Sequence, residues 1–334
     1  MKSLLTLLMM TLAISISSGQ IVTDKNLGSF GYGEKKMKKA PMEVFVHRFS
    51  VHYQVLSSGA QTSTSGKTRA EMAVALDGVT PDIMQRITDN AYKRMVDKLE
   101  AAGYVVKTAD QVEAEMFSDW TRVEGGEYSM NQLMGFVSTM PTGQPYLIKG
   151  IDKKGKAKSN FFDVTPKISK QVGDIPVLEA NINFQFVTIE GNSFINEASK
   201  LKGIVSYEIP ESAIAQSADG LLGNGSIATA PTIMRIIWKG GAPGAGALSN
   251  YTYIPKKGIE IPGVVESKKF KEYVSPSYNY NNNPYSSLVF SVKKDLDVSH
   301  VVKTDAKAYE EQTQQALNEY IDKVVDTFIE NSKG

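Results

Sequence analysis

Histidine is the residue most often used for metal binding and for proton transfer near neutral pH, and the chain contains three: His47, His52 and His300. His47 and His52 stand five positions apart in a stretch that alternates like a β-strand, so alternation predicts that they face opposite sides of a sheet. They would then be unable to share one metal ion. His300 follows Asp297 and Ser299 where a strand should give way to a helix. We therefore predict no metal site and interpret all three as surface or core histidines.

The carboxylates and other reactive side chains form no local catalytic motif. Neighbouring pairs such as Glu113 with Glu115 do not differ from a solvated charged face, although the acid and base of a hydrolase can stand far apart in sequence. No nucleophile elbow, zinc-protease helix motif or calcium loop occurs, and the lack of cysteine removes thiol catalysis and thiolate metal sites. The sequence predicts a protein that is not an enzyme and carries no cofactor.

Two glycine clusters share only their composition with phosphate-binding loops. The cluster at 220–225 lacks the lysine and Ser/Thr of such a loop, and the cluster at 240–246 continues into Ala247 and Leu248. A phosphate-binding turn needs its glycines between a strand and the start of a helix, whereas in the unit at 79–115 the glycine follows the helix. We interpret the clusters as turns and the unit as scaffold.

Side chains suited to binding occur in two loop-like segments. Tyr278, Tyr280 and Tyr285 stand among asparagines, and aromatic faces beside amide groups suit either a sugar or a protein surface. Leu221 and Leu222 lie in the charge-poor segment SAIAQSADGLLGNGSIATAP, which is typical of either a mobile loop or a surface hairpin that meets a partner. These five are the predicted interaction residues.

The chain begins with the features of a secretory signal peptide at residues 1–19. An apolar run at 4–14 follows a single lysine, and Ser17 and Gly19 fit the small-residue positions before a cut at Gln20. The run is shorter than the roughly 20 residues that a membrane-spanning helix needs. We expect an exported protein that is periplasmic, associated with the outer membrane or extracellular.

Residues 20–40 are predicted to form a flexible basic leader. Its GEKKMKKA run at 33–40 is either a solvated linker or a docking tail for an acidic partner or a membrane face. The whole chain is nearly neutral, with a formal net charge of +1, so no global field attracts nucleic acid.

The first elements of the folded part follow from periodicity and caps. Residues 42–55 alternate as a strand, with Phe45, His47, Phe49 and the other odd positions on its mainly buried face. Thr80, Pro81 and Gly103 delimit a helix, as N-cap, first helical residue and C-terminal stop. A short strand at 104–106 and a second helix at about 109–117 should follow.

The rest of the chain reads as strands, two long loops and a final helix. Ala180, Ile182, Phe184 and Phe186 alternate with polar residues in VLEANINFQFVTIEG, which predicts a strand with one apolar face. The other expected elements are a possible helical extension in SMNQLMGFV, strands in QPYLIKGI, GIVSYEIP, TIMRIIW and SSLVFSVKKDL, loops at 207–232 and 274–286, and a C-terminal helix with a stripe from Leu317 to Ile329.

This order of elements predicts an α/β (α+β) fold. We expect a mixed β-sheet with helices packed mainly on one face and the C-terminal helix docked on the core. No linker divides residues 41–331, so a single domain is expected.

Six segments carry a resemblance to a known family: the strand MEVFVHRF, the helix ending in LEAAGYVV, the following TADQVEAE, the strand ANINFQFVTIEG, TIMRIIWKGG and the helix ALNEYIDKVVDTFIE. Together they resemble the periplasmic α/β fold of the curli-secretion channel subunits. The order is also similar to that of flagellar-ring and TolB N-terminal proteins. The resemblance covers about two thirds of the chain and concerns the order of the elements and their pattern of apolar and polar residues, not a diagnostic motif. This chain lacks the lipid-bearing cysteine of those subunits, so the resemblance implies an accessory or assembly component of the cell envelope rather than a pore.

Two functional hypotheses remain from the sequence. The first is a non-enzymatic exported envelope protein that acts as a structural or assembly component through protein–protein contacts, as a homo- or hetero-oligomer and with peripheral membrane association as an option. The second is a secreted glycan-binding protein or polysaccharide hydrolase that uses the Tyr/Asn-rich loop and dispersed carboxylates.

Overall fold

The computed structural model confirms the α/β class, with mixed sheets and a C-terminal helix packed on their core. It describes residues 19–62, 69–113, 115–126, 135–149, 163–192, 200–216, 227–240, 246–272 and 298–333. Nearly all of the predicted signal peptide, residues 1–18, lies outside these ranges.

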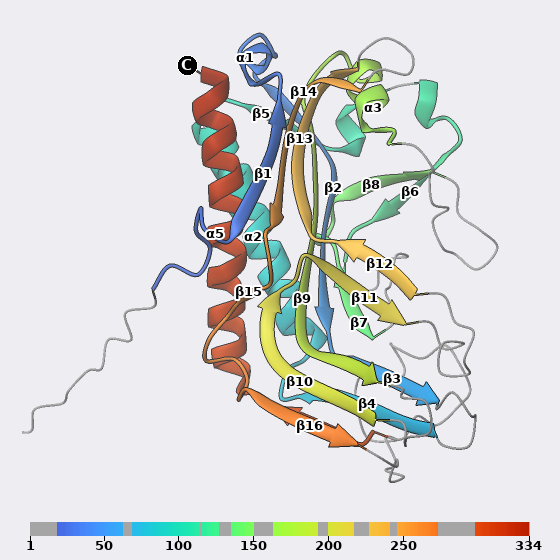
Figure 1. Ribbon diagram of the computed structural model, residues 1–334. Helices are drawn as coiled ribbons and strands as arrows, with labels where there is room; N and C mark the ends of the chain where they lie inside the picture. The colour runs from blue at the N-terminus through green and yellow to red at the C-terminus, as the bar shows by residue number, and fades with distance from the viewer. Residues whose placement is uncertain are drawn as a thin grey trace, which may run out of the picture.

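The main sheet is organised around one long strand, β9 (Val177–Asn192). The first half of β9 lies between β13 (Ile233–Gly240) and β2 (Glu43–Gln54), and its second half pairs with β10 (Lys200–Ile209). The remaining strands of this sheet are β1 (Leu27–Tyr32), β5 (Val105–Lys107), β7 (Phe136–Thr139), β14 (Ala247–Pro255), β15 (Ile259–Glu260) and β16 (Lys268–Glu272). Because β2 runs parallel to β5 and β9 while the other pairs are antiparallel, the sheet is mixed (Figure 1).

The two long helices, α2 (Pro81–Ala101) and α5 (Ala306–Lys333), lie side by side on one face of this sheet (Figure 1). Both form where the apolar stripes predict them, and the stripes are buried against the apolar face of β9. Thr80 takes the extended N-cap conformation, although its side chain makes no capping hydrogen bond. Gly103, with a φ of 91°, ends the first helix as expected.

The second predicted helix, at 109–117, is wrong. Its described residues, 109–113 and 115–117, contain two single 3-10 turns, Ala109–Gln111 and Glu115–Phe117. Thr108 and Gln111 do form a capping box, but Val112 is already extended, so the turn stops after three residues. Phe117 packs on other aromatic rings, so its burial does not depend on a complete helix.

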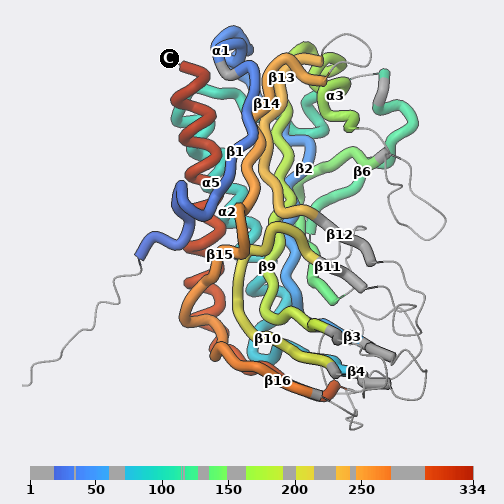
Figure 2. The backbone as a smooth tube through the Cα atoms, in the orientation of Figure 1, coloured from blue at the N-terminus to red at the C-terminus, as the bar shows by residue number. Residues whose placement is uncertain are grey.

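Smaller elements lie on the face of the main sheet that the long helices leave open, or continue its lower end (Figures 1 and 2). They are β3 (Leu56–Thr62) with β4 (Arg69–Asp77) and β17 (His300–Lys303), β6 (Trp120–Glu124) with β8 (Pro145–Lys149), β11 (Ser212–Gln216) with β12 (Ile227–Pro231), and α3 (Thr165–Gln171). The strand predicted in QPYLIKGI is confirmed as β8. The helical extension predicted in SMNQLMGFV is wrong at its end, because Phe136 and Val137 belong to β7, and residues 129–134 lie outside the described ranges.

The flexible leader predicted at 20–40 is also wrong. It forms β1, which pairs with β14, and the helical turn α1 (Glu34–Met37). Ile21, Val22 and Met37 are buried in the main core. A few apolar residues therefore suffice to hold this segment in place, because they pack against the edge of the sheet and against α5.

The start of the described chain is tied to α5 by backbone hydrogen bonds. The amides of Ile21 and Val22 both donate to Oε2 of Glu319, at 2.6 and 2.8 Å. Replacing Glu319 with alanine should lower the free energy of unfolding by about 1–3 kcal/mol, because it strands these two amides near the core. Glu330→Ala, at an exposed position of the same helix, is the control for urea denaturation and should change little. Equal losses of unfolding free energy in the two variants would show that the hydrogen bonds from Ile21 and Val22 to Glu319 do not stabilise the fold.

Most of the described residues of the loop predicted at 207–232 form strands, and residues 217–226 lie outside the described ranges. Residues 207–209 belong to β10, and β11 and β12 pair as the two arms of a hairpin, with Ser212 opposite Pro231 and Gln216 opposite Ile227. Of the two alternatives for this segment, its described residues therefore form the hairpin. The loop at 274–286 and the strand predicted in SSLVFSVKKDL lie outside the described residues. Among the helices that the structure describes, none is long and apolar enough to cross a membrane.

Candidate functional site

A β-bulge in β2 decides where its histidines point. Val46 lies opposite Leu178 and Arg48 opposite Glu179, so His47 is an extra residue in the parallel pairing. The bulge reverses the alternation, and the prediction that all odd positions of β2 share one face is wrong. Val44 and Val46 before the bulge, and Phe49, Val51 and Tyr53 after it, all enter the main core.

His47 and His52 therefore lie on the same face of the sheet, contrary to the prediction. His47 approaches Glu179 of β9, and His52 contacts Asn181, two residues further along β9 on the same face. Both imidazoles are buried. On this side of the sheet, which the long helices do not cover, lies a row of polar side chains that we call the polar layer: His47, Arg48, Ser50, His52, Glu179, Asn181, Asn183 and Arg235 from the strands, with Asp163, Thr165 and Thr232 from the segments that contact them.

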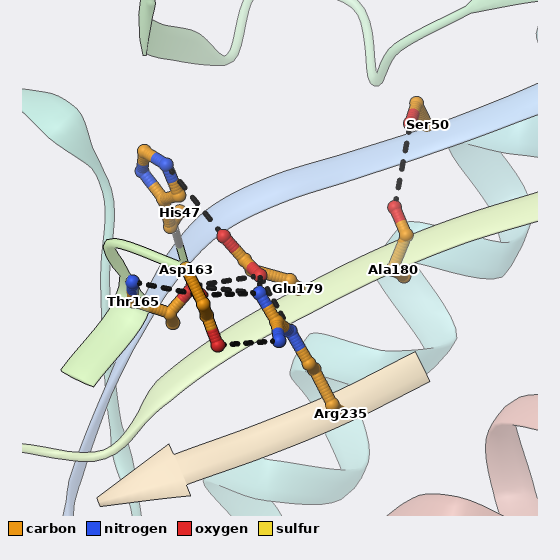
Figure 3. A network of polar contacts seen from close by, with 7 residues as sticks. All are labelled: His47, Ser50, Asp163, Thr165, Glu179, Ala180 and Arg235. Atoms are coloured by element: carbon orange, nitrogen blue, oxygen red, sulfur yellow. Dashed lines mark hydrogen bonds and ion pairs between the residues drawn. The ribbon is translucent and has the colours of Figure 1, made fainter. Parts of the chain in front are cut away.

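Arg235 of β13 is the centre of one end of the polar layer (Figure 3). It lies directly opposite Glu179 in the β13–β9 register and donates from Nε to Oε2 of that carboxylate at 2.7 Å. Its two terminal nitrogens donate to the carboxylate of Asp163 at 2.9 and 3.0 Å, and one of them donates to Thr165 at 2.7 Å. The guanidinium is thus engaged on every nitrogen by the protein itself.

The charges in this cluster compensate one another. Burial alone would raise the pKa of Glu179, but the adjacent Arg235 outweighs it and holds the pKa below the ordinary value. Burial lowers the pKa of His47 to about 4, although the carboxylate of Glu179, with Oε1 3.7 Å from Nε2, works in the opposite direction. At neutral pH the cluster therefore holds an ionised glutamate, an arginine and a neutral imidazole. None of these is poised to exchange a proton near pH 7.

A second group in the polar layer contains a serine, a histidine and an asparagine. Nε2 of His52 lies 2.8 Å from Oδ1 of Asn181, and Nδ1 lies 2.6 Å from Oγ of Ser138. The Asn181 amide is oriented by its own donation to the carbonyl of Pro231 at 2.7 Å, so Oδ1 must accept and Nε2 must carry the hydrogen. Nδ1 then accepts from the serine hydroxyl.

This geometry has the connectivity of a nucleophilic triad but lacks access. Ser138 has no exposed surface and His52 is 3 % exposed, so a substrate carbonyl has no route to the hydroxyl. Burial also lowers the pKa of His52 to about 4, which weakens it as a base. We interpret the group as a buried structural tie between β2, β7 and β9.

The far end of the polar layer clamps the base of the β11–β12 hairpin. Asn181 donates to the carbonyl of Pro231, and Nδ2 of Asn183 donates to Thr232 at 3.0 Å. The amide of Thr232 donates across the hairpin base to Glu211 at 2.8 Å. The asparagines that interrupt the apolar pattern of β9 are thus hairpin anchors, and the hairpin projects from the polar layer away from α2 and α5 (Figure 1).

The predicted interaction residues Tyr278, Tyr280, Tyr285, Leu221 and Leu222 all lie outside the described residues. His300 lies in β17, where its ring stacks on Phe270 with the centroids 4.0 Å apart. Within the described ranges no group of three or more histidine or acidic side chains is placed to hold a metal ion.

Sequence reasoning missed the Arg235 cluster. A signal existed, since Arg235 interrupts the apolar run TIMRIIW and Glu179 interrupts VLEANINF. An isolated charge in a strand that is otherwise apolar needs a partner when it is buried. The partner, however, is identified only by the register of β13 on β9.

Comparisons of the chain with protein-family models, with curated proteins and with solved structures found no significant match. The resemblance to the curli-secretion channel subunits therefore stays a prediction.

Proposed function

We propose that this protein is an exported component of the bacterial cell envelope that acts in assembly through protein–protein contacts, with the hairpin at 211–232 as its contact element. The observation that carries the proposal is the clamp at the hairpin base. Asn181 and Asn183 of the central strand hold Pro231 and Thr232, at the end of the second arm, and the first arm pairs with the second from Ser212 to Gln216, so both arms are fixed to the sheet.

The composition of the hairpin suits a protein partner. Its twenty residues from Ser212 to Pro231 include one charged side chain, Asp219, and the pair Leu221–Leu222 stands between the two arms in sequence. Interface cores are depleted in charge and take up apolar side chains. Ala213 on one arm is buried against Phe136, which anchors the hairpin on its apolar side as well.

The polar layer supports a non-enzymatic role. Every guanidinium nitrogen of Arg235 is engaged by Glu179, Asp163 or Thr165, and Ser138 and His52 are buried. A catalytic site needs polar groups that are preorganised but still open to a substrate. The hydrogen bonds of Arg235, His52, Asn181 and Asn183 join neighbouring segments of the fold and support the hairpin.

The test of this function is the oligomeric state of the chain from Gln20, measured by light scattering in parallel with a variant carrying Leu221→Ser and Leu222→Ser. The wild-type chain should form a species larger than one copy, alone or with an envelope partner, and the variant should lose most of it. Thermal melting is measured on both chains, and a melting temperature of the variant within about 2 °C of the wild type, the shift that roughly 0.5 kcal/mol produces in a chain of this size, shows that a loss of assembly does not come from unfolding.

A matched control is the pair Ser57→Ala and Ser58→Ala in β3, which belongs to the neighbouring β3–β4 hairpin. Assembly that survives in the Leu221/Leu222 variant, or that is lost equally in the β3 control, would contradict the hairpin as the contact element.

A further inference from the structure

The helical turn α1 and the two residues after its end hold four lysines in a fixed array. Lys35, Lys36, Lys38 and Lys39 are exposed, whereas Met37 between them is 1 % exposed and belongs to the main core. Backbone hydrogen bonds continue the turn, from the Lys36 amide to Gly33 at 2.8 Å and from the Lys39 amide to Lys36 at 2.9 Å. The lysine side chains are therefore presented by a folded, anchored turn rather than by a tail.

None of these four ammonium groups forms an ion pair with a side chain that the structure describes. Some other lysines are paired with carboxylates, since Lys98 lies between Asp322 and Asp326, and Lys323 contacts Asp24. With a formal net charge of only +1 on the whole chain, this turn is a local concentration of positive charge and not part of a general basic surface.

Two large aromatic side chains stand exposed immediately before the turn. Phe30 and Tyr32 of the edge strand β1 are 62 % and 49 % exposed, and alternation places them on one face of the strand. β1 leads directly into α1 at one end of the molecule (Figure 1). We call this surface the basic–aromatic corner, and it consists of Phe30, Tyr32, Lys35, Lys36, Lys38 and Lys39.

We propose that the basic–aromatic corner docks on the headgroups of an anionic phospholipid membrane. Clustered lysines bind the phosphates of anionic lipids, and exposed aromatic rings insert at the level of the headgroups. An acidic protein would account for the lysines alone, whereas a membrane surface accounts for the unshielded rings beside them as well. The proposal deepens and rests on the proposed envelope function, because it names the surface on which an assembly component would be held.

The experiment is co-sedimentation of the purified chain from Gln20 with phosphatidylcholine vesicles that contain or lack about one third phosphatidylglycerol. The wild-type chain should sediment with the anionic vesicles only. Binding should disappear at about 1 M salt, where the screening length falls to about 3 Å.

Two variants separate the contributions of charge and aromatic rings. Replacing Lys35, Lys36, Lys38 and Lys39 with glutamine should weaken binding at least about tenfold, since each lysine near the surface adds to the attraction. Phe30→Ser with Tyr32→Ser should weaken binding while leaving its salt dependence intact. The matched control replaces four other exposed lysines with glutamine, namely Lys257, Lys269, Lys271 and Lys303. This control should bind like the wild type, and thermal melting should confirm that each variant is folded.

Several outcomes would overturn the proposal. One is failure of the wild-type chain to bind anionic vesicles, and another is an equal loss of vesicle binding in the two lysine variants. A third is binding to polyglutamate without binding to vesicles, which would identify an acidic protein as the partner. The Leu221/Leu222 variant should still bind the vesicles. Its binding separates this inference from the hairpin proposal, since each surface can fail without the other.

Discussion

Replacing Arg235 with methionine is expected to lower the free energy of unfolding by about 3–5 kcal/mol, one of the two largest effects that the structure predicts. The substitution leaves the carboxylate of Glu179 without its countercharge on the side of the sheet that carries the polar layer, where the Glu179 side chain is only 16 % exposed. It also releases Asp163 and Thr165, which tie the start of α3 to the sheet. Urea denaturation monitored by circular dichroism measures the loss.

Two further variants test the reason for that loss. Arg86→Met removes an arginine that also makes a two-nitrogen contact with a carboxylate, that of Glu310, but at a position that is 54 % exposed. It should cost less than about 1 kcal/mol. Combining Arg235→Met with Glu179→Leu should restore part of the stability, because the stranded charge is gone. A loss in Arg235→Met no larger than that in Arg86→Met would show that the polar layer is more open than described.

Acidification from about pH 7 to about pH 4.5 is expected to destabilise the protein through His47 and His52. The pKa of each is lowered from 6.5 to about 4, mainly by burial. Between these values the unfolded chain binds more protons than the folded chain, so stability is complete above about pH 6.5 and declines as the pH falls towards 4. At 1.36 kcal/mol per pKa unit, each histidine accounts for about 3 kcal/mol across the full window.

Denaturation at several pH values tests this dependence in the wild-type protein, in His47→Gln, in His52→Gln and in the double variant. Each single change should remove about half of the slope between pH 6.5 and 4.5, and the double change should remove most of it. The carboxylates Glu179 and Asp163, whose pKa values are held low, contribute only at lower pH. A double variant that keeps the full slope would show that the two imidazoles accept protons freely in the folded state.

Local patterns predicted the elements whose periodicity is uninterrupted. The apolar stripes of α2 and α5 and the alternation of β9 from Ala180 to Phe186 each run over several turns or strand pairs, and all three elements form as expected. β2 has an equally clear pattern, but the bulge at His47 inserts one residue and exchanges the faces of the strand. A bulge depends on the register of the neighbouring strand, which the local sequence does not reveal.

The remaining errors have the same physical origin in distant contacts. Ile21 and Val22 are buried because Glu319, almost 300 positions away, accepts from both backbone amides. The Arg235 cluster assembles residues from α3, β9 and β13, whose approach follows from the register of β13 on β9 and from the packing of α3 on β13. The asparagines of β9 were visible as interruptions, yet their role as hairpin anchors required the position of Pro231.

The most direct test of the central claim is site-specific photo-crosslinking in the intact cell envelope, with a photoreactive amino acid placed at Leu222 and, as a control, at Lys303 of β17. The hairpin account predicts a discrete protein adduct from position 222, either with a second copy of this chain or with another envelope protein, and no such adduct from position 303. The absence of any protein adduct at position 222, in cells where the chain is exported and folded, would contradict it.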